Sequence, residues 1–277
     1  MLAILAHAGC GTDAAQEAPL HIERIGHSPA SFSANSYLIV GEEDAILVDA
    51  PEARSDADTL VAKIRALGVV PSRVFITHSH PDHFLAVDRI VDAFPEIEIL
   101  STAAVAERVN AIGPRMLNAM RESLGAESPD RFMPVQAVTG SRLNLDGQLI
   151  EIIGFEGGED RIAAMLHVPA RSALITGDVV YARAHLYLGG RDVTTWLDQL
   201  DHIETMDLDV LHPGHGPSTD KTAINKMREY LAFFLATVIE TDDAADAIEA
   251  MRQRYPDYAA ESLLEEFSVP AFMQSAE

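Results

Sequence analysis

The stretch I-T-H-S-H-P-D-H at residues 76–83 decides how this chain is interpreted. It continues the apolar run 74–76, which predicts a short buried strand over 73–77. Three histidines and one aspartate then follow within six residues: His78, His80, Asp82 and His83. Protonated imidazoles at this spacing would repel one another, whereas neutral imidazoles can surround a cation. The stretch therefore predicts a metal site on a loop after a strand and disfavours an incidental polar loop.

Two later stretches offer the further ligands that such a site needs. T-G-D at 176–178 ends an apolar strand expected over 172–176, so Asp178 is expected at a strand terminus. P-G-H-G at 213–216 follows a strand expected over 208–211, and its glycines allow the backbone to bring His215 close to other groups. Each stretch alone is weak, because an aspartate at a strand end is more often a turn or cap residue.

The rest of the chain alternates between strand and helix patterns. A hairpin is expected from strands at 35–40 and 45–48, joined by the turn G-E-E-D. Helical spacing of apolar residues predicts helices over 56–67, 84–94, 102–124 with an interruption at Gly113-Pro114, 196–206, 221–238 and 243–254. Further strands are expected over 97–100, 134–138, 142–145, 148–155 and 161–168. This alternation predicts an α/β fold. Residues 21–277 show no composition break and are interpreted as one domain, with C-terminal helices from about 219.

Composition limits the class of partner. The 277 residues include 20 Lys and Arg against 43 Asp and Glu, for a formal net charge of −23. This balance argues against nucleic acid and anionic membranes as partners, and favours a small neutral or cationic substrate over a polyanion. No run approaches the roughly 18 apolar residues of a membrane-spanning helix. The sequence sets no oligomeric state.

The single cysteine, Cys10, follows the short apolar stretch M-L-A-I-L-A-H-A-G and precedes G-T-D-A-A-Q-E-A-P. This arrangement is similar to a bacterial lipoprotein signal, in which the cysteine becomes the lipidated first residue. Residues 1–20 are then a signal and tether, with a lipid anchor at Cys10 and a periplasmic or membrane-anchored location. The alternative is an unprocessed N-terminus and a cytoplasmic location.

Taken in order, the hairpin N-S-Y-L-I…I-L-V-D at 35–49, T-H-S-H-P-D-H, T-G-D and P-G-H-G resemble the metallo-β-lactamase superfamily of metallohydrolases. The resemblance covers residues 21 to about 238. It implies a four-layer αβ/βα sandwich, with one or two divalent metals, zinc first among them, at one edge between two β-sheets. The family pattern implies this ligand set: His78 and His80 on a first metal, Asp82, His83 and His215 on a second, Asp178 bridging both, and Asp49 beneath the site.

The family pattern also expects another histidine as a ligand of the first metal, and this chain lacks one between His83 and His167. Counting back about ten residues from Pro169 leads to Glu159, in G-F-E-G-G-E-D; Glu156 is the second choice. A carboxylate can replace imidazole on zinc, and it shifts the preference toward manganese or iron. The alternative is that both glutamates are solvated and the first metal is weakly bound or absent.

Three functions compete. The leading hypothesis is a metallo-hydrolase in which a metal-bound hydroxide attacks a small-molecule ester, lactone, thioester or lactam. Asp82 would orient the hydroxide and pass its proton to the leaving group. The alternatives are an iron-dependent oxidoreductase of the same fold, which a glutamate ligand would suit, and a non-catalytic metal-binding relative.

Further candidates concern the substrate. Tyr181 stands three residues after Asp178, where a tyrosine polarises the substrate carbonyl in lactone-hydrolysing members of the superfamily; the alternative is a core tyrosine. His185 is a candidate to contact substrate or to replace a ligand. Met116, Met120 and Phe132 could line a substrate pocket, although apolar residues at helical spacing are more often core.

Overall fold

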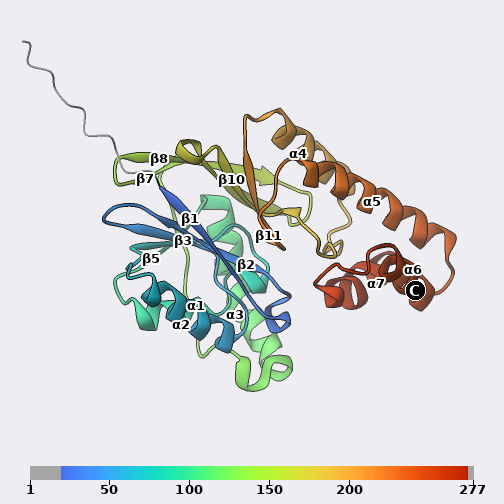
Figure 1. Cartoon of the computed structure of the whole chain (residues 1–277). Helices are drawn as coiled ribbons and strands as arrows, with labels where there is room; N and C mark the ends of the chain where they lie inside the picture. Colours follow the sequence, from blue (N-terminus) through green and yellow to red (C-terminus); the bar gives the residue numbers. More distant parts are fainter. Residues whose placement is uncertain (1–19, 274–277) are drawn as a thin grey trace, which may run out of the picture.

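The computed structural model describes residues 20–273, so Cys10 and most of the expected lipoprotein signal lie outside the described residues. The chain forms two β-sheets that pack against each other, with helices on their outer sides (Figure 1). The predicted α/β sandwich, in four layers with C-terminal helices, is confirmed. Within the described part, no helix is both long and apolar enough to cross a membrane.

The first sheet contains six strands in chain order. They are β1 (His21–Gly26), β2 (Asn35–Val40), β3 (Ala45–Val48), β4 (Arg73–Phe75), β5 (Glu98–Ser101) and β6 (Gln136–Ala137). The first three pair antiparallel and the last three add in parallel. Parallel neighbours need crossover connections, and helices α1 (Arg54–Ala66), α2 (Val87–Ala93) and α3 (Ala103–Leu124) provide them on the outer side of the sheet (Figure 1).

The second sheet has the order β11-β10-β9-β8-β7. Its strands are β7 (Arg142–Leu145), β8 (Gln148–Glu156), β9 (Ile162–Val168), β10 (Ala173–Tyr181) and β11 (Val210–His215). Only β10 and β11 pair in parallel, and α4 (Val193–Thr205) connects them. Helix α5 (Thr222–Glu240) follows, and buried Trp196 and Phe234 from these two helices pack in one cluster with Leu174 and Leu211 of the sheet.

Alternation along the strands separates the layers. Leu47 of β3 and Val74 of β4 belong to the cluster that holds α1, α2 and α3. Their neighbours Val48 and Phe75 instead pack with Ile150 of the second sheet. Because successive strand residues point to opposite faces, each central strand is buried on both sides. The ends of these strands are therefore held firmly enough to position a site.

The structure differs from the sequence predictions in several elements. Strand β1 was not expected, and α3 continues without the interruption expected at Gly113-Pro114. Phe132 packs against Gly113, where a Cβ would lie 2.2 Å from its ring, so the glycine serves packing and does not end the helix. After α6 (Ala244–Arg254), the chain adds a π-helical turn, Leu263–Ser268, and α7 (Val269–Met273), beyond the two closing helices expected.

Candidate metal centre

The histidine stretch leaves the first sheet at the end of β4 and crosses toward the second sheet. Pro81 opens a single 3₁₀ turn, Pro81–His83, which returns Asp82 and His83 toward the strand end. His78 forms an isolated bridge with Ala163 of β9, and the Ala164 amide donates to the Thr77 carbonyl at 2.8 Å. The loop therefore connects the two sheets at one edge, where the sequence predicted a metal site.

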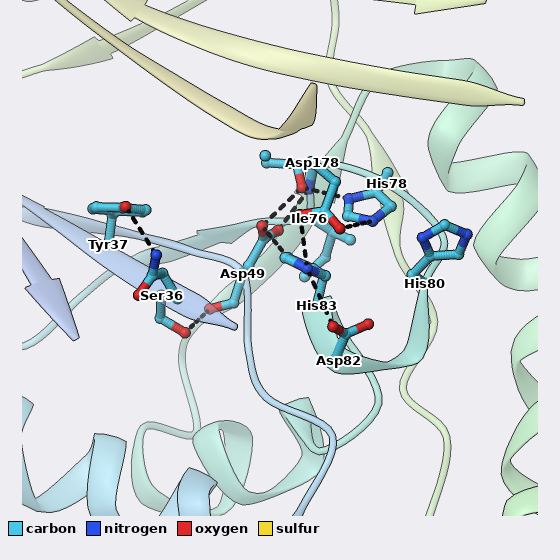
Figure 2. A network of polar contacts seen from close by, with 12 residues as sticks. Ser36, Tyr37, Asp49, Ile76, His78, His80, Asp82, His83 and Asp178 are labelled. Carbon is cyan, nitrogen blue, oxygen red and sulfur yellow. Dashed lines mark hydrogen bonds and ion pairs between the residues drawn. The ribbon is translucent and has the colours of Figure 1, made fainter. Parts of the chain in front are cut away.

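Asp49 holds this loop from beneath, as expected. Its carboxylate accepts hydrogen bonds from the Thr77 amide and hydroxyl, both at 2.7 Å, and lies 2.9 Å from His83 Nδ1. Asp49 is at the centre of the network in Figure 2. Because His83 Nδ1 is engaged by a carboxylate, its Nε2 is left to face the site.

Asp178 lies inside β10 and not at a strand end, which corrects the sequence expectation. The pairing of β10 with β11 shifts register on both sides of Gly177, whose φ of +50° lies in the left-handed region that glycine adopts at the least cost. A Cβ on Gly177 would also lie 2.8 Å from Thr77 Oγ1. This irregularity lets the strand continue to Tyr181 while Asp178 faces the histidine loop.

His215 is the last residue of β11, and its Nδ1 lies 3.0 Å from the Phe32 carbonyl. That contact leaves Nε2 directed at the centre, 3.2 Å from Asp178 Oδ2 and 3.3 Å from Asp82 Oδ2. The glycine before it, Gly214, packs directly on Asp178: a Cβ there would lie 1.8 Å from Asp178 Oδ1. The P-G-H-G motif therefore permits the close approach that its glycines predicted.

Three groups of ligand-type atoms result among the described residues, each within 4.8 Å. One contains Asp49, His78 and His83 and lies at the base of the loop. The other two, Asp82 with His83 and His215, and His78 with His80, Glu159 and Asp178, together form the metal group. Asp178 connects them, because its Oδ1 lies 3.2 Å from His83 Nε2 and its Oδ2 lies 3.7 Å from His78 Nε2. Figure 2 shows His78, His83, Asp82 and Asp178 close together, with the His80 ring to one side.

The donor atoms in these groups fit a metal. Among the described residues, Nε2 of His78, His83 and His215 and Oδ1 of Asp178 are buried without a hydrogen-bond partner. Leaving a buried polar atom unpaired costs about 1–3 kcal/mol. Four such atoms directed at one small volume are the donor set that a divalent cation would satisfy.

Electrostatics support the same interpretation. Burial opposes a charge on His80, but the Glu159 carboxylate outweighs it and raises the pKa of His80 to about 10. Burial similarly opposes a charge on His83, but Asp178 and Asp82 hold its pKa well above the usual value. Burial and the neighbouring His83 lower the pKa of His78 to about 3. Burial also opposes a charge on His215, but Asp178 raises its pKa to about 9. The buried carboxylates thus favour positive charge at this place.

Of the two glutamates considered for the missing histidine, only Glu159 lies in the group. Its side chain is buried, with Oε1 3.0 Å from His80 Nδ1 and Oε2 3.9 Å from His78 Nε2. Glu156 is exposed at the end of β8. The alternative of two solvated glutamates therefore does not hold for Glu159.

Sequence reasoning missed the residues that position this glutamate. Asp160 accepts hydrogen bonds from the Ser79 amide at 3.0 Å and hydroxyl at 2.6 Å, and so ties the glutamate loop to the histidine loop. Asp192, the N-cap of α4, accepts from the Gly158 amide at 3.2 Å. Nothing in the local sequence distinguishes these aspartates from solvated ones, because their partners are distant in the chain.

Tyr181 lies between the metal group and a cavity. Its hydroxyl donates to Asp178 Oδ2 at 2.6 Å, and its ring stacks on His215 with centroids 4.8 Å apart. Burial and the neighbouring Asp178 hold the pKa of Tyr181 well above its usual value, so the hydroxyl remains a donor. The cavity, of about 330 Å³, is lined by Phe32, His80, Pro81, Asp82, Met116, Met120, Asp178, Tyr181, Tyr187, His215, Leu263 and Phe267. Phe132 is not in this lining.

His185 does not reach the centre. It is buried, its Nδ1 lies 2.9 Å from the Tyr230 hydroxyl, and it does not line the cavity beside the ligands. Burial, with a smaller contribution from Arg252, lowers the pKa of His185 to about 4. The ring is therefore neutral and packs against α5.

The family model described as the metallo-beta-lactamase superfamily matches residues 31–215. The chain belongs to the metallo-beta-lactamase superfamily. This superfamily consists mostly of metal-dependent hydrolases, and its matched region holds every ligand-type residue described above. Two curated relatives are similar to the chain: the Beta-lactamase-like protein 2 homolog of Caenorhabditis elegans, 25% identical over 213 residues, and the Atrochrysone carboxyl ACP thioesterase of Passalora fulva, 20% identical over 223 residues. The alignments cover 75% and 78% of this chain but only 64% and 59% of those relatives.

Solved structures with low sequence identity to the chain show the same fold. A beta-lactamase domain protein from Burkholderia ambifaria superposes with a TM-score of 0.64 at 18% identity, covering 92% of this chain and 91% of its own. A metallo-beta-lactamase family protein from Thermus thermophilus gives 0.63 at 15% identity, with the same coverage of 92% and 91%. Both matches extend over the C-terminal helices as well as the sandwich.

Proposed function

We propose that the protein is a metal-dependent hydrolase that cleaves an ester, lactone, thioester or lactam bond in a small molecule. The observation that carries this proposal is the set of buried, unpaired ligand atoms beside a mostly apolar cavity that Asp82 and Tyr181 also line. An acyl group can enter such a cavity while its carbonyl lies at the polar end. The similarity to a protein named as a thioesterase makes a thioester the first bond to test.

The metal ligands in this proposal are His78, His80, Glu159 and Asp178 for one ion, and Asp82, His83, His215 and Asp178 for the other. Zinc suits the imidazoles, and Glu159 extends the choice to manganese or iron. A bound divalent metal would lower the pKa of a water molecule and polarise the substrate carbonyl.

The chain's own residues would complete the reaction. The Asp82 carboxylate borders the cavity, where it would accept the proton of the attacking water and return it to the leaving group. The Tyr181 hydroxyl stays protonated and would donate a hydrogen bond to the carbonyl oxygen as negative charge develops there. Phe32, Met116 and Met120 would exclude water from the acyl group.

Activity of protein purified without chelators tests the proposal. The panel contains a nitrophenyl ester, a lactone, an acyl thioester and a lactam, each with added Zn²⁺, Mn²⁺ or Fe²⁺. We expect turnover of at least one member and its loss in Asp82→Ala, whereas Asp257→Ala, at an exposed aspartate after α6, should behave as wild type.

Two results would contradict the proposal. A metal-loaded protein that turns over no member of the panel would support a non-catalytic metal-binding relative. One iron per chain together with oxygen consumption would instead support the oxidoreductase alternative.

A further inference from the structure

A second cavity lies beside the metal group, on the side of Glu159. Its volume is about 420 Å³, and it shares His80 and Tyr187 with the apolar cavity. The Tyr187 ring packs edge-on against His80, with centroids 4.7 Å apart, and contacts Phe267 of the apolar cavity. A ligand that extends past His80 and Tyr187 can therefore occupy both cavities. The second one differs in chemistry, because most of its lining is polar.

The carboxylates in the second cavity are already occupied by donors of the protein. Asp160 accepts from Ser79 through Oδ2 and from the Arg161 amide, at 2.6 Å, through Oδ1. Asp192 accepts from the Thr195 and Gly158 amides. Glu159 faces His80 at 3.0 Å. These acidic groups are consumed inside the fold, so they are poorly placed to bind a cationic ligand.

The two arginine side chains in the same cavity have no charged partner in the described part of the protein, whereas these carboxylates already have donors. Arg108, on α3, forms no ion pair with any described residue, and its Nε is buried without a hydrogen-bond partner. Arg161 at the exposed rim also has no ion pair within residues 20–273. Six other arginines pair with carboxylates: Arg54, Arg73, Arg89, Arg131, Arg228 and Arg252. Exposed arginines such as Arg115 and Arg171 also lack an ion pair within residues 20–273, so the distinguishing feature of Arg108 is its buried Nε at the cavity. In so acidic a chain, an arginine left unpaired at a cavity is free to bind an anion.

We propose that the second cavity is a subsite for one anionic group of the substrate, a carboxylate or a phosphate, bound by Arg108 with Arg161 at the rim. The acyl portion would lie in the apolar cavity and the scissile carbonyl between the two, beside His80. This inference deepens the proposed hydrolase and rests on it for the position of the scissile bond. The net charge of −23 still disfavours a polyanion, whereas a single anionic group is held at short range by the guanidinium.

Binding of matched small acids to the metal-loaded protein tests the subsite directly. Butyrate, glutarate and 4-phosphonobutyrate share one carboxylate that can reach a metal, and the last two carry a second anionic group. By calorimetry we expect wild type to bind at least one of these two about tenfold or more tightly than butyrate. Which of them is preferred distinguishes a carboxylate from a phosphate.

The ratio of the Kd of butyrate to the Kd of the preferred acid should fall toward one in Arg108→Ala and recover in part in Arg108→Lys. It should persist in Arg142→Ala, at an exposed arginine on β7. Equal binding of all three acids by wild type, or an unchanged preference in Arg108→Ala, would overturn the subsite.

Hydrolysis of 4-nitrophenyl butyrate and of mono-4-nitrophenyl glutarate separates this inference from the proposed function. We expect kcat/KM of wild type to favour the charged ester, and the ratio to fall about tenfold or more in Arg108→Ala. If wild type hydrolyses neither ester but Arg108-dependent binding is present, the hydrolase proposal fails for these esters while the anion subsite stands.

Discussion

A glycine sets one of the strictest constraints on the metal group. A Cβ at Gly214 would meet Asp178 Oδ1 at 1.8 Å, so even alanine must displace the carboxylate that connects the two ligand sets. We therefore expect Gly214→Ala to retain less than half the metal of wild type after dialysis, measured by elemental analysis. Gly154→Ala is the matched control, because a Cβ there meets nothing within 4 Å. Full metal content in Gly214→Ala would mean that Asp178 does not hold metal.

Tyr181 can be tested by removing a single oxygen. Tyr181→Phe keeps the ring that stacks on His215 but loses the donor now directed at Asp178. If that hydroxyl stabilises developing charge, kcat should fall about 10²-fold with little change in KM and in metal content. An unchanged kcat at full metal content would return Tyr181 to the role of a core tyrosine.

At the residue scale, the sequence predicted which ligand-type side chains lie close together where they share one short motif or flank a glycine. The order of His78 to His83, Asp178 and His215 was enough to place them together. Burial was needed to choose Glu159 over Glu156, since both belong to the same glycine-rich stretch of sequence. His185 shows that closeness to a motif in sequence is not enough. It follows Asp178 by seven residues, yet its ring contacts Tyr230 of α5 and not the metal group.

At the scale of elements, α4 supports the metal group without contacting it. Its N-cap, Asp192, joins the helix to Gly158, and Gln199 from the next turns donates to the Gly157 carbonyl at 2.9 Å. These two glycines precede Glu159, so the helix fixes the loop that carries Glu159.

Asp192→Ala should therefore act at two places at once. Loss of the cap should lower the free energy of unfolding by about 1 kcal/mol, and release of the loop should weaken metal binding through Glu159. Asp192→Asn is the matched control, because asparagine caps helices equally well and can still accept from Gly158. Chemical denaturation and metal titration measure the two effects. A variant with a weakened helix and unchanged metal affinity would show that α4 does not position Glu159.

The sequence predicted helices and strands correctly where a regular spacing of apolar residues continued over a long segment. The predicted ends of helices and strands were wrong where tertiary contacts outweighed the local conformational preference of the residues. Pro114 lies inside α3 because Val105, Val109 and Leu117 bury one face of the helix, which outweighs the hydrogen bond that proline removes. Strand β10 runs past its expected end because the irregular pairing at Gly177 carries it onward to Tyr181.

At the scale of the whole molecule, the metal group contains residues from both sheets and lies where the two sheets meet. His78, Asp82 and His83 come from the loop after β4 of the first sheet, while Asp178 and His215 come from β10 and β11 of the second. The apolar core between the sheets holds them together elsewhere. A bound metal would add ligand bonds across the same interface, and the overall sandwich could be predicted from sequence because these motifs occur in a fixed order.

This placement predicts that metal stabilises the entire chain and not only the loop. A ligand that binds the folded state alone at a hundred times its Kd adds about 2.7 kcal/mol, which for a chain of this size should raise Tm by about 5–10 °C. Thermal unfolding with and without EDTA measures the shift, and re-addition of Zn²⁺ or Mn²⁺ should restore it. Asp178→Ala, which lacks the carboxylate proposed to serve both metals, should show a much smaller response. Equal Tm values for metal-loaded and EDTA-treated wild type would mean that the two sheets are held together without the metal.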